Sequence, residues 1–164
     1  MNDAFKISGY IKLYEFPQNY TYDKIRNLSD EQKDEFLVDA GKNLIVDTGL
    51  TQIIDLMVGT DTSSFTHCRV GSGTNTPTNA DTDMQTIIES GVAVTNRYKS
   101  GLTANFETFF GTAANNGTWT ETGIANAATG SDLLCRRKFA AAFTKATTNT
   151  ALIAWIITFE AVAD

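Results

Sequence analysis

The last alternating segment of the chain constrains its fold more than any other stretch. In "TALIAWIITFEA", residues 150–161, one face carries Ala151, Ile153, Trp155, Ile157, Phe159 and Ala161. Apolar residues at a period of two indicate a half-buried strand. The core residues that we expect from it are Ile153, Trp155, Ile157 and Phe159. The opposite face is also half apolar, so we expect a central strand or one whose outer face is covered by another element.

Shorter alternating segments occupy much of the remaining chain. Residues 5–16, "FKISGYIKLYEF", alternate in the same way, and Pro17 ends that segment. After residue 65 the pattern is again that of strands separated by Gly- and Asn-rich turns. Asn116-Gly117 is a dipeptide preferred in tight hairpins, and Thr129-Gly130 marks another turn. Serial hairpins of this kind predict an antiparallel sheet.

One stretch has the period of an amphipathic helix. Its apolar stripe falls at i, i+3, i+4 and i+7, on Leu50, Ile53, Ile54 and Met57. We expect Leu50, Ile53 and Ile54 to pack into the core. Asp47 or Thr48 is the expected N-cap, and Gly59 is the expected left-handed stop. A second, short helical turn is expected after Ser29, because Gln32 stands in the capping-box position.

Together these patterns predict a mainly β fold. We expect an antiparallel β-sandwich, jelly-roll-like, with one packed amphipathic helix. The 164 residues are expected to form a single β-sandwich domain over residues 1–164, with a partly helical insertion at about 17–36.

Charge and composition limit the partners. The formal net charge of −6 argues against a nucleic-acid partner, because phosphate binding requires clustered Lys and Arg. No window is long and apolar enough for a membrane span, and the first residues do not resemble a signal peptide. We therefore expect no membrane partner and a protein made soluble in the cytoplasm. Cys68 and Cys135 are expected to be reduced, although one bridge between them stays open.

Residues capable of catalysis or metal binding are few. A structural role is favoured for His67, the only histidine. Asp81-Thr82-Asp83 begins like a calcium loop but lacks the later residues of that motif, and "VGSGTNTP" fits a flexible connection better than a dinucleotide site. Glu107 and Glu121 could approach one another, yet surface carboxylates are the simpler interpretation. We therefore expect no catalytic, cofactor-binding or metal site, and a protein that is not an enzyme.

Aromatic side chains offer a binding alternative. Tyr10 and Tyr14 share the polar face of the first strand, and Trp119 lies in a Thr-rich hairpin. These three residues are the expected sugar or interface contacts, because aromatic rings stack on sugars and are enriched at protein contacts.

Four motifs in a fixed order carry a family resemblance. They are "NLIVDTGLTQIIDLMVG", "CRVGSGTNTPTNADTDM", "FFGTAANNGTWTETGIANAATGSDLLCRRKF" and "TALIAWIITFEA". In this order and spacing they resemble a family of small tailed-bacteriophage virion proteins, commonly labelled tail-fibre, head-fibre or minor structural proteins. The matching positions are Gly71, Gly73, Pro77, Asp81, Asn116, Gly117, Glu121, Gly123, Asn126, Trp155 and Phe159. The sequence departs from the family pattern at Ala125, where an aromatic residue is expected, and in the more basic Arg136-Arg137-Lys138.

The resemblance implies a structural role in a virion. We expect a non-enzymatic subunit in the neck, tail or fibre-attachment region, or a capsid decoration. Its partners would be other copies of itself, as a trimer or ring, and other virion proteins of the portal, neck, tail or capsid. The alternative from another class is a carbohydrate- or receptor-binding β-sandwich module of the particle.

Overall fold

A computed structural model describes residues 4–130 and 132–162, so the outermost residues of the expected domain and Ser131 lie outside the described residues. Strands hold 50% of the residues and helices 14%. The strands are β1 Ala4–Pro17, β2 Leu37–Ile45, β3 His67–Gly71, β4 Val92–Ala93, β5 Asn96–Ser100, β6 Thr103–Phe110, β7 Gly117–Ala125, β8 Leu133–Lys145 and β9 Asn149–Val162. The helices are α1 Tyr22–Arg26, α2 Asp30–Asp34 and α3 Asp47–Val58.

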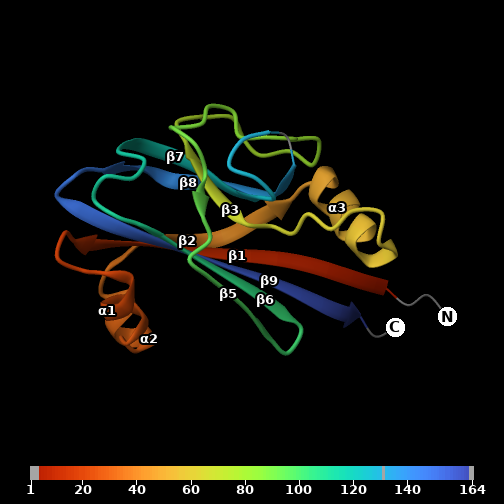
Figure 1. Cartoon of the computed structure of the whole chain (residues 1–164), viewed down its shortest axis with the longest axis horizontal. Coiled ribbons are helices and arrows are strands. Elements are labelled where there is room, and N and C mark those ends of the chain that lie inside the picture. Colours follow the sequence, from red (N-terminus) through yellow and green to blue (C-terminus); the bar gives the residue numbers. More distant parts are fainter. Residues whose placement is uncertain (1–3, 131, 163–164) are drawn as a thin grey trace.

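The strands form one antiparallel sheet in the order β4-β3-β7-β8-β2-β1-β9-β6-β5. β2 joins the two halves of the sheet, because its first part pairs with β1 and its last two residues, Leu44 and Ile45, pair with β8. Figure 1 shows the curl that results, with β3, β7 and β8 above β1, β9 and β6. The mainly β, antiparallel part of the expected fold is therefore confirmed, while a sandwich or jelly-roll is not.

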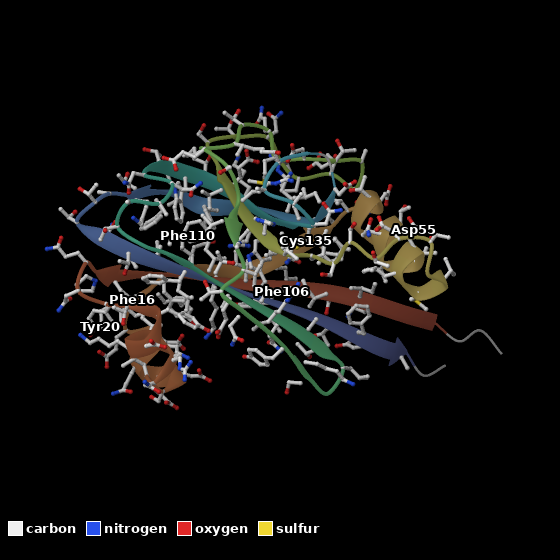
Figure 2. The ribbon with its side chains drawn as sticks, viewed as in Figure 1. Phe16, Tyr20, Asp55, Phe106, Phe110 and Cys135 are labelled. Atoms are coloured by element: carbon white, nitrogen blue, oxygen red, sulfur yellow. The ribbon has the colours of Figure 1, made fainter. Side chains whose placement is uncertain are left out.

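The main core lies between the two halves of the curled sheet. β9 contributes Ile153, Trp155 and Ile157, each at most 1% exposed. The opposite half contributes Trp119 from β7 and Cys135 from β8 to the same cluster. Figure 2 shows Phe110 and Cys135 between the halves. Phe159, expected in the core, is partly buried and packs against this cluster.

A second cluster covers the other face of β9, as its two-sided apolar pattern predicts. Buried Tyr14, Phe16, Ile25 and Leu152 join the segment that carries α1 and α2 to the outer face of β1 and β9. Figures 1 and 2 show these helices below the sheet, beside Phe16 and Tyr20. The predicted capping box is confirmed, since the Ser29 hydroxyl accepts from the Gln32 amide and the Gln32 side chain accepts from the Ser29 amide. The expected insertion is thus two short helices packed on aromatic rings.

α3 is rotated relative to the predicted orientation. Its buried residues are Gly49 and Gln52. A Cβ on Gly49 would lie 2.4 Å from the Leu134 carbonyl oxygen, so only glycine permits this close approach to β8. As a result Ile53 packs on the core, Leu50 is half-buried, and Ile54 is 58% exposed. The prediction of Ile54 as a core residue is therefore wrong.

The two ends of α3 differ in how well the sequence predicted them. Gly59 ends the helix with a φ of 75°, as expected. The N-cap is Val46, which makes no side-chain cap bond, rather than Asp47 or Thr48. The Thr48 hydroxyl instead donates to the Leu133 carbonyl at 3.0 Å, which ties the first turn to the start of β8. Across the described residues, no helix is both long and apolar enough to cross a membrane.

Candidate functional site

Two of the three aromatic residues expected to contact a ligand are buried. Tyr14 is 4% exposed, because it belongs to the cluster beneath α1 and α2. Trp119 is 0% exposed, and its indole Nε1 donates to the Asn115 carbonyl at 2.7 Å. Its ring packs edge-on between Phe110 and Phe143. The expectation of ligand contact at Tyr14 and Trp119 is therefore wrong, whereas Tyr10 is 40% exposed.

His67 and Cys68 have structural surroundings. His67 is half-buried, and its Nδ1 lies 2.9 Å from the Thr66 hydroxyl. Burial, with the nearby Arg69 charge, lowers the pKa of His67. Cys68 is fully buried, and burial raises the pKa of its thiol to about 11. Cys68 and Cys135 are both free thiols in the core, and the raised pKa of each disfavours the reactive thiolate.

Glu121, at the middle of β7, is a fully buried charged group, 0% exposed. Its Oε2 accepts from Arg136 Nε at 2.7 Å, and its Oε1 accepts from the backbone amides of Gly73 and Thr86 at 3.0 and 2.9 Å. A Cβ on Gly73 would lie 2.3 Å from Oε1, which explains why glycine is needed there. Two sequence-based interpretations are corrected by this geometry. Glu121 is not a surface carboxylate, and the Gly-rich segment holds it rather than serving as a plain connection.

Arg136 links Glu121 to the aspartate pair that resembled a calcium loop. Its Nη1 donates to Asp81 at 2.6 Å. Burial alone would lower the pKa of Arg136, but hydrogen bonds to Asp81 and Glu121 outweigh it and raise the pKa. Arg69, 0% exposed, pairs with Asp83 at 2.6 Å in the same manner. Asp81 and Asp83 thus form ion pairs with buried arginines.

These ion pairs attach residues 72–91, which contain no helix or strand, to β3, β7 and β8. Paired buried charges of this kind are costly to break, because each remaining partner keeps its desolvation penalty. The signal in the sequence was Arg136 inside the apolar "LLCRRKF", since a basic residue in a buried strand requires an acidic partner. Within the described part of the chain, no three His, Cys, Asp or Glu side chains converge as metal ligands would.

Glu107 and Glu121 do not meet. Glu107 lies on β6, which pairs with β9 and β5, whereas Glu121 lies on β7, between β3 and β8. Glu107 instead accepts a hydrogen bond from the Tyr22 hydroxyl at 2.5 Å. The two carboxylates therefore cannot form an acid–base pair.

An apolar groove of about 750 Å³ lies beside α3. β1, β2 and α3 supply its walls, which include Ile7, Gly9, Ile45, Leu50, Ile53, Ile54 and Met57. We call this hollow the α3 groove. The last turn of α3 extends it with exposed apolar side chains, since Met57 is 81% and Val58 66% exposed. Large exposed apolar patches on proteins are often sites of protein contact, so this surface is a candidate for one.

Comparison with known proteins adds no assignment: scans against protein-family models, curated proteins and solved structures find no match to this chain.

Proposed function

We propose that this protein is a non-enzymatic structural subunit of a bacteriophage virion that assembles with other copies of itself. The α3 groove carries the proposal. Met57, Ile54 and Val58 are exposed by 81%, 58% and 66%, and Ile54 and Met57 line the groove of about 750 Å³. Fully burying an exposed side chain of this size contributes about 1.5–3 kcal/mol, so covering all three offsets part of the entropy cost of association.

A second copy of the chain is the occupant that we propose. Soluble oligomers are mostly built from identical subunits, and closed symmetry covers the same patch on every copy. The motif order that resembles small phage virion proteins supports the same choice, because virion subunits act in multiple copies. The neck, tail, fibre-attachment region and capsid surface are the proposed locations, with neighbouring virion proteins as further partners. The proposal includes a sandwich-like curled sheet as the rigid scaffold of each subunit.

Sedimentation of the purified chain tests this proposal. We expect the wild type to form one oligomer of defined mass, and Ile54→Glu with Met57→Glu to shift it to monomer. Both positions are exposed, so the charged variant keeps its fold by circular dichroism. Leu102→Glu is the matched control, because Leu102 is 68% exposed but lies on the turn between β5 and β6, outside the α3 groove. A wild type that sediments as a monomer at every concentration would contradict the proposal.

Carbohydrate or receptor binding remains the alternative function. Tyr14 and Trp119 no longer support it, because both are buried. Tyr10 still does, and Tyr98 now joins it: both tyrosines lie on the outer face of the sheet, 40% and 49% exposed. A ligand-binding module of the particle would use this face rather than the hairpin that carries Trp119.

A further inference from the structure

A polar cleft lies between the helical segment and the β5–β6 edge of the sheet. Its volume is about 420 Å³, and its lining residues are Tyr22, Arg26, Lys33, Thr95, Asn96, Tyr98 and Glu107. We call it the Glu107 cleft. None of these residues lines the α3 groove, so the two hollows are separate. In Figure 1, α1 and α2 lie in the lower part of the view, where β5 and β6 form one edge of the sheet.

Glu107 is held rigidly within this cleft. Its Oε2 accepts from the Tyr22 hydroxyl at 2.5 Å and from Asn96 Nδ2 at 3.2 Å. Its Oε1 accepts no hydrogen bond from the residues that the structure describes. Burial, followed by the hydrogen bond to Glu107, raises the pKa of Tyr22. Burial, followed by the Glu107 charge, raises the pKa of Tyr98, so both phenols stay protonated at neutral pH. The cleft therefore presents a fixed carboxylate oxygen that can accept from a ligand hydroxyl.

Two cationic side chains of the cleft, Arg26 and Lys33, have N–H donors without a protein acceptor. Within the described residues the Arg26 guanidinium reaches only Asp23, at 3.6 Å, and the Lys33 ammonium reaches only Asp30, at 3.9 Å, so neither side chain donates a hydrogen bond. Asp23 and Asp30 are 84% and 93% exposed, and solvent screens their charges. The Lys33 side chain is only 16% exposed and forms part of the cleft lining. The Arg26 side chain is 61% exposed, so its donors are hydrated and can exchange water for a ligand group. Donors without a protein partner are normally satisfied by water or by a ligand.

The third element of the cleft is an exposed ring. Tyr98 is 49% exposed on edge strand β5. An aromatic face covers the apolar face of a sugar ring while its hydroxyl remains in water. A guanidinium group pairs two N–H donors with a planar carboxylate. The cleft thus combines the aromatic face of Tyr98, a Glu107 oxygen that can accept from a hydroxyl, and the side chains of Arg26 and Lys33.

We propose that the Glu107 cleft binds a saccharide that carries a carboxylate. The ligand carboxylate contacts Arg26 and Lys33, its hydroxyls contact Glu107 and Asn96, and its ring lies on Tyr98. Inorganic phosphate fits less well, because it has no ring to lie on Tyr98 and its dianion is repelled by Glu107 more strongly than a monoanionic carboxylate. Assembly through the α3 groove plays no part in this site, so each proposal can fail without the other.

Calorimetric titration with matched sugars tests the proposal. The acidic probes are sialyllactose and a galacturonate trimer, and their neutral counterparts are the methyl ester of sialyllactose and the methyl-esterified trimer. We expect at least one acidic probe to bind, and its neutral counterpart to bind about tenfold more weakly, because a charge-assisted hydrogen bond is lost. Arg26→Gln should weaken the acidic probe by a similar factor, and Tyr98→Ala should weaken it severalfold.

Tyr10→Ala is the control variant. Tyr10 is an exposed tyrosine on the same face of the sheet but outside the cleft, so its loss should leave the dissociation constant unchanged. The proposal is overturned if neither acidic probe binds at about 10 mM, which corresponds to less than about 3 kcal/mol of binding free energy. Equal binding of acidic and neutral probes, or an equal effect of Tyr10→Ala and Tyr98→Ala, would overturn it as well.

Discussion

Residues 72–91 and residues 18–36 both cover part of the sheet, but different side chains hold them in place. The first segment is attached by buried charges, with Glu121 and Arg136 at the centre. The second is attached by aromatic packing, in which Phe16 stacks on Tyr20 at 5.3 Å and tilts against Phe36 at 4.7 Å. A segment without regular structure leaves many amides unpaired, and a buried carboxylate can accept from several at once. Short helices pair their own amides, so they need only an apolar face.

The largest effect is expected at the charged segment. Glu121→Gln should lower the free energy of unfolding by about 3–5 kcal/mol, because Arg136 would keep its burial but lose a charged partner. Urea denaturation measures this loss. The matched control is Glu160→Gln, since Glu160 is exposed and reaches Lys6 only at 3.6 Å. Its expected effect is below about 1 kcal/mol, and equal losses for the two variants would contradict the comparison.

The aromatic segment should respond to loss of volume. Ile25, on α1, is 0% exposed beneath the helical segment. Ile25→Ala should cost about 2–4 kcal/mol through the cavity it leaves. Hydrogen exchange should then quicken at the Leu28 amide, which donates to the Ile25 carbonyl, and stay slow at Thr86. Glu121→Gln should instead quicken exchange at the Thr86 amide and leave the Leu28 amide unchanged. If either variant quickened exchange at both amides, the two segments would be held in place as one unit.

Acid should loosen the charged segment first. Burial alone would raise the pKa of Asp81, but its hydrogen bonds with Arg136 and Thr78 outweigh it and lower the pKa. A carboxylate whose folded pKa lies below its unfolded value contributes stability above about pH 4 and loses it as the pH falls through the folded pKa. Exchange at the Thr78 amide, which donates to Asp81, should therefore quicken below about pH 4. Asp81→Asn should remove this pH dependence, and a wild-type Thr78 amide that stays slow in acid would count against it.

The smallest effect concerns the helix cap. Ser29→Ala should cost about 1 kcal/mol, because the amide of Gln32 loses its acceptor. Ser29→Thr keeps a hydroxyl and should change stability far less. Thermal denaturation compares the two variants. A loss as large as that of Ile25→Ala would show that capping, rather than aromatic packing, attaches this segment.

Local signals in the sequence predicted the features that depend on neighbouring residues. The period-two pattern of β9 anticipated its buried face, and Ser29 with Gln32 three positions later anticipated a capping box. Gly59 anticipated the end of α3. Each of these features is decided within a few positions of the chain, where spacing alone carries the information.

Features that depend on distant residues could not be predicted in the same way. Glu107 contacts Tyr22, which lies 85 positions earlier, so no spacing rule could place them in one cleft. The orientation of α3 depended on how closely Gly49 approaches β8, and this turned Ile54 toward solvent. Tyr14 and Tyr10 share one face of β1, yet only Tyr14 is covered by the helical segment. Sequence patterns predict which face of an element is apolar but not which segment will cover it.

Oxidation of Met57 tests the central claim of self-assembly most directly. Met57 is 81% exposed in the single chain, whereas Met84 is 6% exposed and serves as an internal control. If copies pack through the α3 groove, peroxide should oxidise Met57 more slowly as the protein concentration rises, while the slow rate at Met84 stays constant. Mass spectrometry of peptides from the intact protein gives both rates. Rapid oxidation of Met57 at every concentration, in a protein that is folded throughout, would contradict the account.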